Sequence, residues 1–178
     1  FITGVGNVGS KLIAQLEQKQ QYLQQHLSLQ IKVVGLANSQ KMLINEEGIA
    51  LKNWWAALKQ GEPTNLDQFI EIIQTKNLRN SVFADVTADD KVAMCYGTLL
   101  QKSISVVACN KVACSSPYEY YRKLKDQARE FSSLFLFETN VGAGLPIIGT
   151  LNDLLRSGDK VNKIEAVLSG TVNFVLNH

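Results

Sequence analysis

The sequence is poor in the residues that would point to a secreted scaffold, a membrane protein or a nucleic-acid binder. It has only three cysteines, an odd number without metal-ligand spacing, which suits the reduced thiols of a cytoplasmic protein. No apolar run approaches the ~20 residues that span a bilayer, so we expect no membrane contact. The formal net charge is only +2 and the lysines are scattered, which argues against nucleic acid as a partner.

What is present fits a globular chain. The 178 residues are 46% hydrophobic and 19% charged, enough for one domain or for one domain and the start of another. The chain opens on Phe1 rather than methionine, its first strand is short, and it stops at His178 inside a predicted helix start. We therefore expect a window of a longer polypeptide.

Apolar runs alternate with amphipathic stretches along most of the chain. Strands are predicted over 31–36, 81–86, 104–108, 134–138 and 163–168, and helices over 66–77, 89–101, 118–131 and 145–156. This alternation predicts an α/β fold with a Rossmann-type doubly wound parallel sheet, which binds ligands at the carboxyl ends of its strands. The pattern changes from Lys163 onward, and we place the boundary near residue 140, which predicts a dinucleotide-binding domain over 1–139 and the start of an α+β domain over 140–178.

The first nine residues place an apolar stub before Gly4, Gly6 and Gly9, and an amphipathic stretch follows. In a G-x-G-x-x-G turn the first glycine permits the tight turn, the second lets the backbone approach a pyrophosphate, and the third lets the helix pack close to the strand. The helix N-terminus adds free N–H groups and a partial positive charge. The pattern predicts a dinucleotide site; the alternative is an ordinary strand–turn–helix without a ligand.

The tip of the second strand bears on which dinucleotide binds. An acidic residue there usually binds the ribose 2′-hydroxyl of NAD, but this chain has Ala37, Asn38 and Ser39. The neutral pair followed by Lys41 favours the 2′-phosphate of NADP, or permits both cofactors, because hydrogen bonds and positive charge suit a phosphate. Lys41 is equally well explained as an ordinary surface lysine.

Two later strand tips also carry polar groups. Thr87 follows the strand at 81–86, where its hydroxyl would bond the cofactor or cap the next helix, a role for which Asp89 competes. Lys111 lies where a nicotinamide would sit and would bind the carboxamide or a substrate oxygen; the alternative is a solvated surface lysine. The neighbouring Cys109 is a conceivable nucleophile, but the sequence offers it no base, so we interpret it as a packing residue.

The loop after the strand at 134–138 joins it to a helix through two glycines and a proline. Glu138 is an acid at the strand end beside exposed loop carbonyls. One carboxylate and several carbonyls suit a hard cation such as Na⁺. The alternative is a glutamate bonded to backbone N–H groups.

At four places the sequence resembles the homoserine dehydrogenases, and together they extend the resemblance over essentially the whole chain. These places are residues 4–9 (Gly-Val-Gly-Asn-Val-Gly), 108–111 (Ala-Cys-Asn-Lys), 138–146 (Glu-Thr-Asn-Val-Gly-Ala-Gly-Leu-Pro) and 168–174 (Leu-Ser-Gly-Thr-Val-Asn-Phe). Residues 35–39, 53–54 and 153–159 are further similar to members fused behind a bacterial aspartokinase. The resemblance implies NAD(P)-dependent interconversion of L-homoserine and L-aspartate 4-semialdehyde, in threonine and methionine synthesis, by a cytoplasmic homo-oligomer, a dimer, that an aspartokinase half precedes.

The resemblance also implies roles for individual residues. By position, the cofactor contacts are Gly6, Asn7, Val8, Thr87, Cys109 and Lys111. The sodium ligands are Glu138 and the backbone carbonyls of Val141, Ala143 and Leu145. The turn that lines the substrate site contains Gly170 and Thr171. The family's acidic substrate-binding residues and catalytic lysine lie downstream of that turn, so we expect no catalytic residue up to His178 and little turnover by this chain alone. Two rival interpretations are an aldehyde dehydrogenase that uses a cysteine and a non-catalytic dinucleotide-sensing module.

Overall fold

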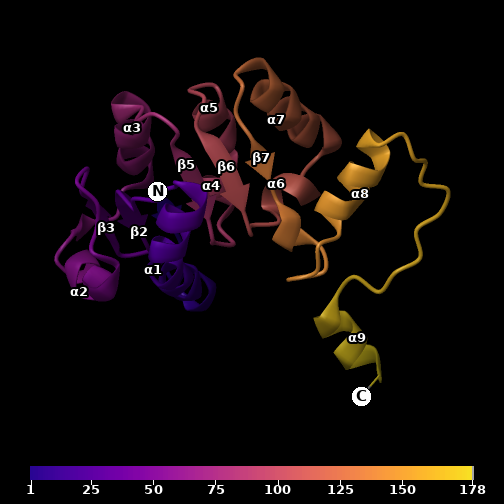
Figure 1. Cartoon of the computed structure of the whole chain (residues 1–178), viewed down its shortest axis with the longest axis horizontal. Helices are drawn as coiled ribbons and strands as arrows, with labels where there is room; N and C mark the ends of the chain where they lie inside the picture. The colour runs from indigo at the N-terminus through magenta and orange to yellow at the C-terminus, as the bar shows by residue number, and fades with distance from the viewer. Residues whose placement is uncertain (178) are drawn as a thin grey trace.

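A computed structural model of the chain describes residues 1–177, apart from the side chain of Thr171 and the exposure of Gly170. Within this range the strands form one sheet in the order β4-β3-β2-β1-β5-β6-β7 (Figure 1). Their bounds are β1 (Ile2–Thr3), β2 (Gly35–Ala37), β3 (Lys41–Ile44), β4 (Glu62–Pro63), β5 (Val82–Asp85), β6 (Ser105–Ala108) and β7 (Phe135–Leu136). The strands β2, β1, β5, β6 and β7 are parallel, whereas β3 and β4 add an antiparallel hairpin at one edge.

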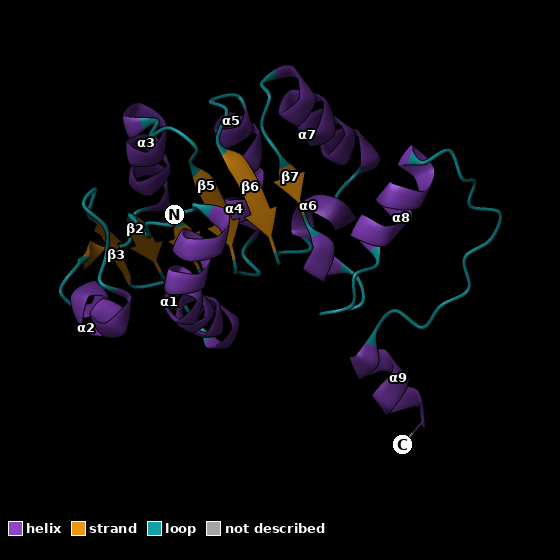
Figure 2. Ribbon diagram, viewed as in Figure 1, coloured by secondary structure: helices purple, strands orange, loops and turns teal. Residues whose placement is uncertain are grey.

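Helices cover both faces of this sheet, so the predicted α/β class and Rossmann-type fold are confirmed (Figure 2). The helices are α1 (Asn7–Leu27), α2 (Trp54–Lys59), α3 (Leu66–Lys76), α4 (Asp90–Met94), α5 (Tyr96–Leu100), α6 (Val112–Ser115), α7 (Tyr118–Glu130), α8 (Ile148–Arg156) and α9 (Gly170–Asn177), with 3₁₀ turns η1 (Leu51–Asn53) and η2 (Glu138–Asn140). The sheet is mixed rather than wholly parallel, because β3 pairs antiparallel with β2 and β4 pairs antiparallel with β3.

Each face of the sheet has its own apolar core. The helices α3, α5 and α7 lie along one face, where Phe69, Tyr96 and Leu124 are completely buried (Figure 2). The helices α1 and α2 lie along the other face, where Ile13 and Leu58 are buried. These two layers hold the strands rigidly, so that the loops at their carboxyl ends have fixed positions.

Several predicted elements differ from the structure. The strand predicted over 134–138 is reduced to β7, and the helix predicted over 145–156 begins only at Ile148, as α8. The strand predicted over 31–36 is confined to β2, because the backbone of residues 33 and 34 bonds to the loop at 45–49 instead. The helix predicted over 89–101 is two helices, α4 and α5, which meet at Cys95.

The strand predicted over 163–168 is wrong. Residues 157–169 form neither helix nor strand, and Ile164 and Val167 are 63% and 77% exposed. A strand is stable only when its backbone groups pair with a neighbouring strand, and the described part of the chain offers this segment no such neighbour.

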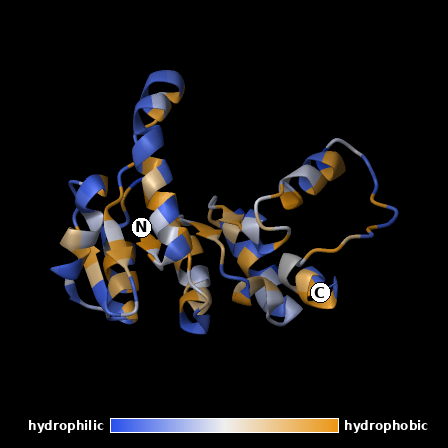
Figure 3. Ribbon diagram, turned by 90° about the horizontal axis from the view of Figure 1, so that it is seen from below, coloured by the Kyte–Doolittle hydropathy of each residue, from blue (hydrophilic) through white to orange (hydrophobic). Residues whose placement is uncertain are grey.

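The first helix is much longer than its contact with the sheet. Only Gly9 and Ile13 of α1 are buried, and its glutamine-rich second half extends away from the rest of the domain (Figure 3). Among the described helices none combines the length and the apolar character needed to cross a lipid bilayer.

Candidate dinucleotide site

The turn between β1 and α1 is shaped by two glycines. Gly4 has a φ of +91°, and a Cβ at this position would lie 2.6 Å from the carbonyl group of Val86. A Cβ on Gly9 would lie 2.0 Å from the carbonyl oxygen of Gly4. Both positions therefore need glycine, the first for its backbone conformation and the second because α1 packs directly on the turn.

Gly6 is different, since a Cβ there would meet nothing within 4 Å. This open space faces the start of α1, a helix of 21 residues with no side-chain cap and no acidic residue in its first turn. Asn7 is exposed and Val8 is 60% exposed. The turn thus presents unpaired N–H groups and the positive end of a helix dipole beside empty space, an arrangement that fits a pyrophosphate.

The turn lies at the point where the strand order reverses. From β1 the chain leads to β2 on one side and later to β5 on the other, and such switch points bind dinucleotides outside the carboxyl ends of the strands. The N–H of Gly4 donates to the carbonyl of Ala37 over 2.9 Å, which joins the turn to the tip of β2. The glycine turn is therefore held next to the tip of β2.

At the tip of β2, Asn38 is half-buried and Ser39 is exposed. The Asn38 side-chain oxygen accepts from the N–H groups of Gln40 (2.8 Å) and Lys41 (2.7 Å), so that it stabilises the β2–β3 turn. The Lys41 ammonium donates to the carbonyl of Gly61 over 2.8 Å. Ser39 thus remains free to meet a cofactor, whereas Lys41 already has a structural partner.

Thr87 lies just beyond β5, directly against Gly4. Its hydroxyl accepts from the N–H of Asp89 (3.1 Å), and Asp89 itself caps α4 by accepting from the N–H of Lys91. Thr87 is therefore not the helix cap, and within residues 1–177 its hydroxyl proton has no acceptor. That proton is available to a ligand at the switch point.

The tip of β6 carries Cys109, Asn110 and Lys111. Asn110 is 1% exposed, whereas Lys111 is exposed and makes no ion pair within residues 1–177. Cys109 is half-buried, and its N–H donates to the carbonyl of Asp85 over 2.8 Å. The structure therefore brings Cys109 and Lys111 to the same edge as Thr87 and the glycine turn.

A buried polar cluster beneath these loops escaped the sequence analysis. The Asp85 carboxylate is completely buried at the end of β5 and accepts hydrogen bonds from Thr87, Tyr96 and Asn110. Asn140 extends the cluster, since its side-chain amide donates to the carbonyl of Asn110 over 3.2 Å. The one sequence feature that could have indicated this cluster is Asp85 itself, an acidic residue at the end of an otherwise apolar strand.

The three cysteines are all free and half-buried. Burial raises the pKa of Cys95, with further increases from nearby carboxylates, and burial also raises the pKa of Cys114. Both thiols therefore stay protonated at neutral pH and are poor nucleophiles. His26 lies far along the exposed part of α1 and not in the strand-tip loops.

Glu138 binds the start of a helix. Its two carboxylate oxygens accept from the N–H groups of Ile148 (2.9 Å) and Gly149 (2.7 Å), at the N-terminus of α8. The alternative of a glutamate on backbone N–H groups thus describes the geometry seen here. Val141 is half-buried, and Ala143 and Leu145 are exposed.

The remaining sequence-based site lies in α9. Gly170 and Thr171 begin this helix, which lies apart from the sheet (Figure 1), and the side chain of Thr171 lies outside the described part of the chain.

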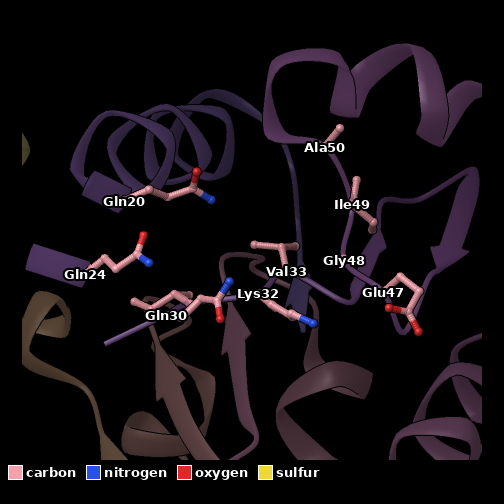
Figure 4. A pocket seen from close by; sticks show the side chains of 10 residues that line it. Gln20, Gln24, Gln30, Lys32, Val33, Glu47, Gly48, Ile49 and Ala50 are labelled. Atoms are coloured by element: carbon pink, nitrogen blue, oxygen red, sulfur yellow. The ribbon is translucent and has the colours of Figure 1, made fainter. Parts of the chain in front are cut away.

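A pocket of about 280 Å³ lies away from the glycine turn. It is lined by Gln20 and Gln24 of α1 and by residues 30–33 and 47–50 (Figure 4). Because residues 30–33 lead into β2 from its amino end, this pocket lies at the opposite edge of the sheet. It is separate from the candidate dinucleotide site.

The fold and the uncapped glycine turn at the switch point define a dinucleotide-binding protein of the Rossmann class. Residues 4–138 match the family described as "Homoserine dehydrogenase, NAD binding domain", and residues 146–178 match the family described as "Homoserine dehydrogenase". The first match alone covers more than half of the sequence, so the chain belongs to the homoserine dehydrogenase family.

Among curated proteins, the chain is 38% identical over 176 residues to a bifunctional aspartokinase/homoserine dehydrogenase of Haemophilus influenzae, covering 98% of this chain and 22% of the relative. It is 37% identical over 179 residues to the chloroplastic bifunctional aspartokinase/homoserine dehydrogenase 1 of Arabidopsis thaliana, covering 99% and 20%. The chain thus spans about a fifth of the length of these relatives.

The chain also superposes on solved structures. A hyperthermophilic archaeal homoserine dehydrogenase in complex with NADPH superposes with a TM-score of 0.67 at 25% identity, covering 84% of this chain and 46% of that one. A Candida auris protein of unknown function superposes with a TM-score of 0.80 at 31% identity, covering 99% and 48%.

Proposed function

We propose that the chain is the cofactor-binding part of an NAD(P)-dependent homoserine dehydrogenase, which interconverts L-homoserine and L-aspartate 4-semialdehyde. The observation that carries the proposal is the glycine turn at the sheet's switch point, where Gly6 leaves open space before an uncapped helix. Family membership supplies the substrate class.

Several of the predicted residues have a task in this proposal. The backbone at Gly6, Asn7 and Val8 binds the pyrophosphate, and the free hydroxyl proton of Thr87 and the free ammonium of Lys111 orient the other half of the cofactor. Bound NADPH supplies the hydride for the semialdehyde carbonyl. Gly170 and Thr171 are proposed to line the substrate site.

The direct test is loss of NADPH absorbance with aspartate 4-semialdehyde, measured on the protein in its natural full length and on residues 1–178. We expect turnover in the full-length protein and cofactor binding with little turnover in the shorter chain. NADPH binding without turnover in either would support the dinucleotide-sensing module instead, and absence of both would overturn the proposal.

We further propose that NADP is preferred over NAD, because no acidic residue lies at the tip of β2. Replacing the exposed Ser39 by aspartate is expected to weaken NADPH binding by roughly tenfold, since a carboxylate there repels the 2′-phosphate. NADH binding is expected to change by less than about threefold. Fluorescence titration measures both. Thr75→Asp adds the same charge near the far end of α3 and is expected to leave both affinities unchanged.

A cysteine-dependent aldehyde dehydrogenase is the second candidate, because Cys109 lies at the site. Cys109→Ser is expected to weaken NADPH binding by no more than about threefold and to retain turnover, since within residues 1–177 the histidine is His26, which lies on α1 and not in the loops around Cys109. The steady-state rate with aspartate 4-semialdehyde measures this, with Cys95→Ser as the matched control. Abolished turnover in Cys109→Ser alone would favour the cysteine mechanism.

Sodium is a finer proposal for the loop after β7, with Glu138 and the backbone carbonyls of Val141, Ala143 and Leu145 as ligands. Support comes from the resemblance alone, because both Glu138 carboxylate oxygens already bind backbone N–H groups. Wild type is expected to unfold at higher temperature in NaCl than in KCl at equal ionic strength. Equal midpoint temperatures of unfolding in the two salts would show that Glu138 is only a helix cap.

The helix cap leads to its own prediction. Glu138→Ala removes the acceptor for two N–H groups of α8 and is expected to lower the free energy of unfolding by about 1–2 kcal/mol. Urea unfolding measures the change. Glu130→Ala, at an exposed glutamate, should stay within about 0.5 kcal/mol of wild type. Equal effects of both variants would contradict the cap.

Assembly and location are further proposals. We infer that residues 140–178 begin a substrate and dimerisation domain, because α8 and α9 expose Leu155, Val175 and Leu176. The fused relatives support a preceding aspartokinase, and free cysteines suit a cytoplasmic location. Light scattering of the full-length protein tests the homo-oligomer, which a monomeric mass would exclude.

A further inference from the structure

The Asp85 carboxylate is an isolated charge. Its residue is 0% exposed at the carboxyl end of β5, and none of the ion pairs within residues 1–177 includes it. Burying a carboxylate is costly unless hydrogen bonds replace the lost water, so this residue needs an explanation beyond packing.

Three donors surround the carboxylate. Its Oδ1 accepts from the N–H of Thr87 over 2.8 Å, and its Oδ2 accepts from the Tyr96 hydroxyl over 2.5 Å and from the Asn110 amide over 3.0 Å. Burial and the neighbouring carboxylate raise the pKa of Tyr96, so its hydroxyl keeps its proton and donates. A set made of donors matches the ionised form of Asp85.

The charge lies on the side of the sheet that takes the second half of a dinucleotide. Asp85 is paired in register with Thr3, which precedes the glycine turn, and with Ala108, which precedes the loop that carries Lys111. In a doubly wound sheet one mononucleotide half binds on each side of the switch point. With the tip of β2 on the adenosine side, Asp85 lies beneath the loops on the nicotinamide side.

We propose that Asp85 determines the preference of this site between oxidised and reduced cofactor. The two forms carry the same phosphates and differ by one positive charge on the nicotinamide ring. A desolvated negative charge therefore favours the oxidised form, whatever its effect on the phosphates that both share. This inference rests on the proposed cofactor binding and adds a specificity-determining residue to it.

Tyr96 and Asn110 act through Asp85 as positioning residues. Tyr96 lies on α5, and the Asn110 amide also donates to the carbonyl of Asp89 over 3.0 Å. The Asn110 side-chain oxygen accepts from the N–H of Val112 over 3.0 Å. The carboxylate is thus fixed between the β5 and β6 loops, and its distance from the ring is set by the fold.

The test compares the dissociation constants of NADP⁺ and NADPH in wild type and in Asp85→Asn, using the full-length protein. We expect the ratio Kd(NADP⁺)/Kd(NADPH) to rise about tenfold, the order that Coulomb's law gives for one charge about 10 Å away at an effective dielectric constant of ~20. An unfolded fraction weakens both apparent affinities equally, so the ratio reports on charge and not on stability.

Two variants control for structure and for net charge. Tyr96→Phe keeps the carboxylate but removes a donor, so both affinities are expected to fall while their ratio stays within about twofold. Asp90→Asn removes an exposed charge at the start of α4 and is also expected to leave the ratio unchanged. If Asp85→Asn does not fold, Asp85→Ser supplies a second uncharged side chain that can accept the Thr87 N–H.

The outcomes separate this inference from the proposed function. Binding of both cofactors to wild type, with an unchanged ratio in Asp85→Asn or Asp85→Ser, would overturn the role of Asp85 and leave the dehydrogenase proposal standing. Failure of wild type to bind either form would overturn both. Restoration of the ratio when Asn110→Asp is added to Asp85→Asn would support the charge itself, because the pair regains one carboxylate and one amide.

Discussion

Replacing Gly9 by alanine is expected to cause the largest loss of stability of any single methyl group added to this site. The new Cβ would lie 2.0 Å from the carbonyl oxygen of Gly4, and both clashing groups belong to the backbone, so that α1 must move away from the turn. We expect the free energy of unfolding to fall by roughly 3 kcal/mol and the melting temperature by roughly 6–12 °C. Calorimetry or thermal circular dichroism measures the change.

Gly144→Ala is the matched control for that experiment. A Cβ at Gly144 would meet nothing within 4 Å, and its position has no left-handed backbone, so its melting temperature should stay within about 2 °C of wild type. A Gly9→Ala protein as stable as the control would show that the helix and the turn are not in close contact.

Gly6→Ser is expected to have the opposite effects: it should weaken cofactor binding strongly and should not destabilise the fold. Serine is a favoured N-cap, so the free energy of unfolding should be unchanged or rise by up to about 1 kcal/mol. NADPH binding should weaken by roughly tenfold to a hundredfold, because the side chain fills the open space and takes an N–H group from the pyrophosphate. Fluorescence titration measures the affinity.

The control for this variant is Gly144→Ser, which adds the same side chain to a glycine in the loop after β7 and should bind NADPH as wild type does. If Gly6→Ser bound NADPH with wild-type affinity, the pyrophosphate would have to lie elsewhere.

The glycine turn and the alternating strands were predictable because local spacing determines them. The antiparallel β3 and β4 were not, since both strands are short and form by pairing, β3 with β2 and β4 with β3. The strand predicted over 163–168 shows the reverse case, in which an apolar segment has the composition of a strand but no partner.

The buried polar cluster around Asp85 could not be predicted either, because it also depends on contacts between residues that are far apart in the sequence. Asp85 precedes its three donors by 2, 11 and 25 positions, and no spacing rule connects them. Acidic residues are almost never fully buried, so the sequence alone gives no reason to place Asp85 in the interior. Glu138 was recognised as a site residue, but its partners begin ten positions later, at the start of a helix.

The hairpin at the edge of the sheet also has a consequence for how copies of this chain behave at high concentration. β4 consists only of Glu62 and Pro63, both exposed, and proline has no N–H to offer a strand from another molecule. Strands that end a sheet are the usual starting points for edge-to-edge aggregation, and short ones bearing charge and proline resist it. The same hairpin that extends β2 therefore closes this side of the sheet to further growth.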